Sequence, residues 1–230
     1  HGGTFLRTTD GGLNWAARVM QGADTLQFRD VDAFDARTAY LMSAGPGSLS
    51  RIYRTDDGGD SWALQFINEH PDGFLDCMAF WDSERGVAYG DAIEGGLFVL
   101  RTEDGGASWM RVPEAALPPA QEGEGGFAAS GSCVTTGSGG RAWIATGNGE
   151  RARVLRTEDE GRTWRSFPVP VNGGPAAGLT TIDVLDTGPG IALGGVLGAV
   201  EAGDLQAWAV CGQETTSSAA AARGSLFVPR

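Results

Sequence analysis

One eight-residue pattern occurs four times in this chain and constrains its fold more than any other feature. The pattern is Thr-x-Asp-x-Gly-x-(Ser/Thr/Asn)-Trp, and we call its copies the repeat motifs. They end at Trp15, Trp62, Trp109 and Trp164, so successive tryptophans are 47, 47 and 55 residues apart. A nearly constant period in this range indicates stacked structural repeats.

Each repeat motif separates two runs of residues that are typical of β-strands. Around the second motif, Ser50–Arg54 precedes the turn and Trp62–Ile67 follows it, and both runs are rich in apolar, aromatic and β-branched residues. The motif is therefore predicted to be the turn of a β-hairpin. Its Asp can accept hydrogen bonds from turn N–H groups, its Gly tolerates a positive φ, and its Trp buries a large ring.

The repeat motif resembles the Asp-box, or bacterial neuraminidase repeat, of sialidases, sortilin-type receptors and related β-propellers. This resemblance implies an all-β fold, a β-propeller built of four-stranded antiparallel blades. In that superfamily the Asp-box is a structural turn, remote from the sialidase catalytic centre. The resemblance therefore implies structural roles for Asp10, Gly12, Trp15, Asp57, Gly59, Trp62, Asp104, Gly106, Trp109, Asp159, Gly161 and Trp164.

The repeats divide residues 1–195 into propeller blades, whose strands we name A to D from the centre outward. The predicted organisation is a half blade at 1–22, full blades at about 24–68, 73–113 and 126–169, and a partial blade at 178–195. The strand pattern then ends, and 196–230 is predicted to be an atypical tail, with disorder as one alternative. Three whole blades do not close a ring, because propellers typically have four to eight, so we expect an incomplete fragment.

Two segments between the motifs narrow the resemblance. Phe80–Asp91 and Gly123–Ser132 resemble stretches of bacterial proteins similar to the photosystem II stability/assembly factor of plants and cyanobacteria. The resemblance covers about residues 1–195 and implies a seven-bladed, exported propeller, of which this chain would be a part. It also implies binding of a protein or peptide partner, and a periplasmic or extracellular location.

Charge and composition exclude several classes of function. The net charge is −12, from 29 acidic residues and 17 basic ones, and every basic residue is an arginine. Binding to a nucleic-acid backbone needs clustered positive charge, so we expect no nucleic-acid partner. No apolar run approaches the ~20 residues that span a membrane.

Histidine and cysteine usage argues against a metal or a cofactor. The two histidines, His1 and His70, are too few for a His-based metal site or a Ser-His-Asp relay, and no redox motif is present. The three cysteines have no CxxC or metal-ligand spacing. Cys77 and Cys133 lie in apolar strand-like runs, so we predict that they are buried free thiols.

The strand order predicts which face of the propeller would carry a site. The A–B and C–D turns lie on one face, and the D–A and B–C connections lie on the other. Since the repeat motifs are C–D turns, they mark the face without a site, and binding residues are expected on the loops opposite. The candidate binding residues there are Arg29, Asp30, Asp76, Asp91, Glu122, Glu124, Ser130 and Arg151.

Two functions from different classes fit this arrangement. The first is a non-enzymatic module that binds a protein or peptide on the face opposite the motifs. The alternative is a glycan-acting propeller, either a sialidase-like glycoside hydrolase or a carbohydrate-binding module. Hydrolysis needs two carboxylates about 5–10 Å apart, for which the weak candidates are Asp76, Asp91 and Glu124. Hydrogen bonding at loop ends is the alternative role for Asp76 and Asp91.

Overall fold

The computed structural model describes residues 2–129, 131–197 and 206–210, and in them the chain is almost entirely β-strand. The strands are β1 (Thr4–Arg7), β2 (Ala16–Val19), β3 (Phe28–Ala33), β4 (Ala39–Ser43), β5 (Arg51–Thr55), β6 (Ala63–Ile67), β7 (Leu75–Phe80), β8 (Gly86–Ile93), β9 (Gly96–Thr102), β10 (Met110–Arg111), β11 (Val134–Gly137), β12 (Arg141–Ala145), β13 (Arg151–Thr157), β14 (Arg165–Asn172), β15 (Ala177–Val184), β16 (Gly190–Val196) and β17 (Gln206–Val210). Three short 3₁₀ turns accompany them: η1 (Gly47–Leu49), η2 (Glu114–Ala116) and η3 (Ser138–Gly140).

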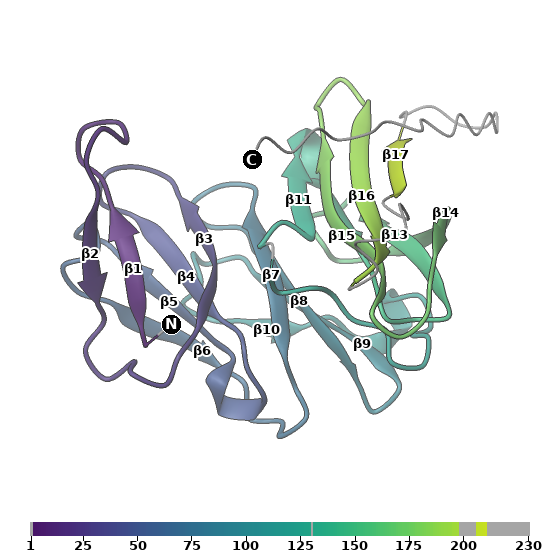
Figure 1. Cartoon of the computed structure of the whole chain (residues 1–230), viewed down its shortest axis with the longest axis horizontal. Helices are drawn as coiled ribbons and strands as arrows, with labels where there is room; N and C mark the ends of the chain where they lie inside the picture. Colours follow the sequence, from purple (N-terminus) through teal and green to yellow (C-terminus); the bar gives the residue numbers. More distant parts are fainter. Residues whose placement is uncertain (1, 130, 198–205, 211–230) are drawn as a thin grey trace, which may run out of the picture.

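The strands form five antiparallel sheets that follow the order of the chain. Three sheets are four-stranded meanders, β3 to β6, β7 to β10 and β11 to β14. They are preceded by the two-stranded sheet β1–β2 and followed by the three-stranded sheet β15 to β17. Figure 1 shows the sheets arranged side by side as blades along an arc, with β1–β2 at one end and β15 to β17 at the other.

The first strand of each meander lies on the inside of the arc. Strand β7 packs against both β3 and β11, and β11 packs against β15, so these A strands line the centre. This arrangement confirms the predicted all-β propeller of four-stranded blades and is consistent with an incomplete ring. The described structure departs from the predicted tail at one point, because β17, within 196–230, pairs with β16. The rest of that tail lies outside the described residues.

The repeat motif closes the outer hairpin of each blade through a small set of hydrogen bonds. In the second motif, the N–H of Gly59 donates to the hydroxyl of Thr55 at 2.8 Å, and that hydroxyl donates to Asp57 at 2.8 Å. Asp57 also accepts from the N–H and the hydroxyl of Ser61, which lowers the pKa of its carboxyl. Gly59 has a φ of 87°, which only glycine adopts readily. The other three motifs repeat these bonds.

The arginine that precedes each motif joins one blade to the next. Arg54 donates from Nη1 to the carbonyl of Gly105 in the third motif at 2.9 Å. Arg101 donates from Nε to the carbonyl of Glu160, which occupies the corresponding position of the fourth motif, at 3.4 Å. Arg156 has no following motif within the described residues, and its Nε is buried without an acceptor there. The motifs therefore form a series of joints between blades as well as the turns within them.

The A strands are joined on the inside of the arc by side-chain bonds to backbone. Asp30 accepts a hydrogen bond from the N–H of Met78 at 2.7 Å, and Asp32 accepts one from the N–H of Phe80 at 3.1 Å. Between the next two A strands, β7 and β11, a disulfide takes the place of these hydrogen bonds.

Cys77 and Cys133 form a disulfide between β7 and the residue just before β11, with their Cα atoms 5.8 Å apart. The prediction of two buried free thiols was therefore wrong. Both residues are fully buried, as expected, but 56 residues of sequence separate them, and only the packing of neighbouring A strands brings them together. Cys211 lies outside the described residues.

The motif tryptophans are buried only where another blade covers them. Trp15 is 60% exposed in the terminal β1–β2 sheet, whereas Trp164 is 5% exposed and belongs to the main hydrophobic cluster. Trp62 packs edge-on against Phe5 of the preceding sheet, with ring centroids 5.3 Å apart. The motif thus supplies the same ring in each repeat, but its contribution to stability depends on the neighbouring blade.

This contrast predicts different losses of stability from the same substitution. Trp164→Ala should lower the free energy of unfolding by about 3–5 kcal/mol, because it empties a buried aromatic site. Trp15→Ala should change it by less than about 1 kcal/mol, since the ring is largely in water. Urea unfolding followed by circular dichroism measures both values, and equal losses would contradict the packing described above.

Candidate functional site

The A strands carry a β-bulge at the same position in three blades. The strand register shifts at Arg29 in β3, at Asp76 in β7 and at Thr180 in β15. A bulge places an extra residue in the strand and re-aims its side chain. Arg29 and Asp76 are each the second residue of their A strand. They therefore lie toward the loop face, which we define as the face opposite the repeat motifs.

At the second bulge, Asp76 meets Asp91 from the end of β8. The two carboxyl groups lie within hydrogen-bonding reach of each other. Asp76 also accepts a hydrogen bond from the N–H of Gly126 at 2.9 Å. Asp76 is 2% exposed and Asp91 is half-buried, so the pair lies at the edge of the interior.

Burial gives this carboxyl pair an unusual affinity for protons. It raises the pKa of Asp91 to about 6, even though the bonds from Gly126 and Asp76 act in the opposite direction. Burial and the neighbouring charge of Asp91 raise the pKa of Asp76 well above its usual range. The pair therefore holds protons at mildly acidic pH, where exposed aspartates are ionised, because two buried carboxylates side by side cannot both ionise freely.

Glu124 lies near this pair but is engaged in a different interaction. Arg153 donates to it from Nε and from Nη2, both at 2.6 Å, and the backbone N–H of Gln121 donates at 2.9 Å. Glu124 is fully buried. Tyr89 is also fully buried, and the charges of the surrounding acids add to burial in raising the pKa of its hydroxyl. That hydroxyl has no hydrogen-bond partner among the described residues.

Three glycines connect the loops that hold these residues. Gly125 pairs with Gly147, and Gly147 pairs with Gly178, so a row of backbone bridges crosses the loop face from the linker after β10 to β15. A side chain at Gly125 would place its Cβ 1.7 Å from Asp91, and one at Gly178 would lie 2.5 Å from Gly147. The close approach explains why this row needs glycine, and it makes the loop face rigid.

The remaining candidates are spread across the loop face. Arg29 is exposed and donates to Gln27 at 2.7 Å. Asp30 is 9% exposed, and burial raises the pKa of its carboxyl to about 7. The same carboxyl accepts the bond from Met78 of the next blade. Glu122 is exposed, and Arg151 is 78% exposed at the side chain. Ser130 lies outside the described residues.

The structure thus brings Asp76, Asp91 and Glu124 together, whereas Arg29 and Arg151 stand apart as surface charges. Sequence reasoning missed Tyr89, Gln121 and Arg153, which complete the cluster. Tyr89 could have been suspected, because it lies two residues before Asp91 in the same strand. Arg153 carries no local signal, since its position in β13 is typical of an exposed strand residue.

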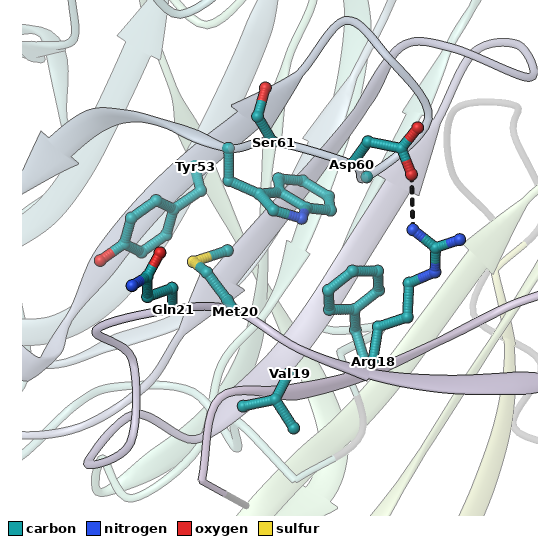
Figure 2. A pocket seen from close by; sticks show the side chains of 10 residues that line it. Arg18, Val19, Met20, Gln21, Tyr53, Asp60 and Ser61 are labelled. Atoms are coloured by element: carbon teal, nitrogen blue, oxygen red, sulfur yellow. Dashed lines mark hydrogen bonds and ion pairs between the residues drawn. The ribbon is translucent and has the colours of Figure 1, made fainter.

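Two cavities lie away from this cluster. One, of about 620 Å³, lies between the β1–β2 hairpin and the β5–β6 hairpin, and Figure 2 shows the side chains that line it. The other, of about 530 Å³, lies between the A–B turns near Trp81, Ser138 and Asp186. Among the described residues, no group of three or more acidic, His or Cys side chains could hold a metal ion. No helix in the described ranges has the length and apolar character of a membrane-spanning segment.

Comparison with solved structures agrees with the fold. The chain is similar to a GH74 enzyme from Niastella koreensis, with 17% identity and a TM-score of 0.54 over 91% of this chain and 27% of that one. It is also similar to the NanB sialidase from Streptococcus pneumoniae, with 11% identity and a TM-score of 0.54 over 83% of this chain and 32% of that one. YCF48 bound to D1 peptide has 21% identity and a TM-score of 0.49 over 76% of this chain and 52% of that one.

The similarity to the two enzymes shows a shared propeller fold and nothing finer, because identity is low in both cases. The chain spans about a third or less of the length of either enzyme and about half that of YCF48. No protein-family model and no curated protein matches the sequence.

The raised pKa values predict that stability falls as the pH rises from 5 to 8. In the unfolded chain Asp30, Asp76 and Asp91 ionise near pH 4, whereas the folded protein holds their protons to about pH 6 or above. The unfolded state therefore binds fewer protons in this range, and stability falls with increasing pH. Asp91→Asn should flatten this dependence, because an amide can donate to Asp76 without a shared proton.

Thermal unfolding midpoints at pH 5, 6, 7 and 8 test this prediction. The matched control is Asp35→Asn, because backbone bonds from Thr38 and Arg37 lower the pKa of Asp35 and keep it ionised over the whole range. The control should retain the decline of the parent protein. A midpoint that rises with pH, or an equal slope in Asp91→Asn, would show that the pair does not hold a proton.

Proposed function

We propose that this chain is part of a non-catalytic β-propeller that binds a protein or peptide partner on its loop face. The main support for the proposal is that the acidic candidates of that face, Asp76, Asp91 and Glu124, bond to other residues of the protein. Asp76 and Asp91 contact each other, and Glu124 is paired with Arg153 in the interior. Glycoside hydrolysis instead requires two carboxyl groups about 5–10 Å apart, with room for the sugar between them.

The groups that remain on the surface of the loop face suit recognition. Glu150, at the end of the loop between β12 and β13, and Arg151, the first residue of β13, have side chains 85% and 78% exposed. Glu94, in the turn between β8 and β9, is 77% exposed and lies 3.6 Å from His70. The backbone bridges between glycines and the buried Glu124–Arg153 pair hold the neighbouring loops in place. Binding therefore does not have to order these loops first.

The disulfide supports a location outside the cytoplasm. Structural disulfides form and persist mainly in oxidising compartments, and the Cys77–Cys133 bond joins two blades in the interior. We therefore propose a periplasmic or extracellular location for the protein.

One observation favours the alternative, a glycan-acting enzyme. Burial raises the pKa of the half-buried Asp91 to about 6, and a carboxyl group that keeps its proton near neutral pH can act as a general acid. The candidate reaction would be hydrolysis of a glycosidic bond, with Asp91 as the acid. The other carboxylate of the cluster, Glu124, is fully buried and paired with Arg153, so it is not free to act as base or nucleophile, which is why we favour binding.

Selection of peptides from a random library displayed on phage tests the proposed binding. Peptides selected on the folded protein should lose at least about tenfold in affinity, or 1.4 kcal/mol, when the loop-face pair is reversed as Glu150→Arg/Arg151→Glu. The matched control reverses a pair on the motif face, Glu103→Arg/Arg162→Glu, and should leave affinity unchanged. Selected peptides that respond only to the control reversal would contradict the proposal.

A panel of fluorogenic glycosides tests the alternative. We expect no turnover above the buffer blank, because hydrolysis needs two available carboxyl groups and Glu124 is buried against Arg153. Turnover that is lost in Asp91→Asn and retained in Asp35→Asn would establish hydrolysis and overturn the non-catalytic assignment.

A further inference from the structure

The larger cavity has an aromatic wall and a charged mouth. Phe5 and Trp62 form the wall, packed edge to face, and Tyr53 continues it. Figure 2 shows Arg18 reaching Asp60 at one end of the cavity, where the ion pair measures 2.5 Å. The cavity therefore offers an apolar surface to a ligand while its opening stays polar, as in other specific binding pockets.

The indole N–H of Trp62 differs from those of Trp15 and Trp164. In Trp15 and in Trp164 the indole N–H donates to the glycine carbonyl of the same motif at 3.0 Å. The indole N–H of Trp62 is buried and has no acceptor among the described residues. Because this nitrogen has almost no accessible surface, Trp62 contributes its ring, and not its indole N–H, to the wall of the cavity.

The chain itself shows what covers the corresponding tryptophan at another joint. The backbone N–H of Trp164 donates to the carbonyl of Ala116 at 2.9 Å. Ala116 and Leu117 pack against the hydrophobic cluster that contains Trp164, and η2 shapes this segment between two proline-containing stretches. A short peptide segment with one carbonyl and one aliphatic side chain thus fills the position beside Trp164.

The linker between the first two blades, from β2 to β3, is too short to cover Trp62 in this way. Residues 20–27 connect β2 to β3 and turn at once through backbone bonds from Ala23 to Met20 and from Leu26 to Ala23. The linker from β10 to β11 spans 112–133. No backbone carbonyl among the described residues accepts the backbone N–H of Trp62. The cavity beside Trp62 lies where the longer linker packs beside Trp164.

We propose that this cavity binds a short peptide segment of a partner protein. The segment places an aliphatic side chain against Phe5 and Trp62, and one of its backbone carbonyls accepts a hydrogen bond from the backbone N–H of Trp62, as Ala116 does from Trp164. The site is separate from the loop face, because it is built from the outer hairpins of two neighbouring blades. It therefore does not depend on the function proposed for that face.

The probe is a peptide that copies residues 113–119, acetyl-Pro-Glu-Ala-Ala-Leu-Pro-Pro-amide. In NMR spectra of the ¹⁵N-labelled protein, Trp62→Phe identifies the indole N–H signal of Trp62 by its loss. Titration with the peptide should shift that signal with a Kd of about 0.1–1 mM, as expected for a few buried atoms and one hydrogen bond. A peptide with Asp in place of Leu should bind at least about tenfold more weakly, since it buries a charge.

Two variants test the position of the site. Val19 lines the cavity and is 62% exposed, so Val19→Arg should fold normally, obstruct the cavity and weaken binding at least about tenfold. Trp109→Phe is the matched control, because the indole N–H of Trp109 also lacks an acceptor but its ring packs against Phe80, with centroids 5.8 Å apart. The control and the loop-face reversal Glu150→Arg/Arg151→Glu should leave the titration unchanged.

Three results would overturn the proposal. One is an unshifted Trp62 signal at about 5 mM peptide, several times the expected Kd. Another is a titration that persists unchanged in Val19→Arg. The third is a shift of the Trp62 signal by N-acetylglucosamine but not by the peptide, which would assign the cavity to a sugar. Peptide binding here together with an inactive loop face would separate this site from the function proposed above.

Discussion

The bond on which the rest of the structure depends is the one between the motif's threonine hydroxyl and its glycine N–H. In the second motif it joins Thr55 to Gly59 and orients the hydroxyl toward Asp57, which then accepts from Ser61. This closed turn sets where the tryptophan enters the next strand. It also exposes the carbonyls to which the arginine of the preceding blade donates, as Arg54 does to Gly105. Turn, hydrophobic ring and inter-blade joint therefore follow from one local set of bonds.

A second set of joints lies on the inside of the arc and gives the loop face its character. Asp30 reaches the backbone of the next A strand, the Cys77–Cys133 disulfide replaces that bond one blade later, and Asp76 holds the linker at Gly126. These carboxyl groups are buried, which raises their affinity for protons. Acidic residues that look like catalytic candidates in the sequence are thus part of the inner scaffold. What remains exposed on this face is charge of both signs, as at Glu150 and Arg151.

The fold could be predicted further than the site. The motif spacing and the alternation of strand-like runs were sufficient to locate the hairpins, because both depend on residues that are close in sequence. The face opposite the motifs followed from strand order alone. The contact between Asp76 and Asp91 could not be predicted, since it depends on a bulge in β7 that re-aims one side chain. The pairing of Glu124 with Arg153 joins a long linker to a strand of another blade, and no local pattern marks it.

The sequence by itself determined the repeat, its turn and the strand order, because each of these rests on hydrogen bonds and periodicity within a few residues. Only the tertiary structure decided which tryptophans are buried, which cysteines are bonded and which carboxyl groups hold protons at mildly acidic pH. Trp15 and Trp164 come from the same motif, yet one is 60% and the other 5% exposed, because burial is a property of the neighbouring blade. Cys77 and Cys133 likewise meet only when two A strands pack side by side. The cavity beside Trp62 also depends on tertiary structure. The short linker from β2 to β3 leaves this side of Trp62 uncovered, whereas the longer linker from β10 to β11 covers Trp164.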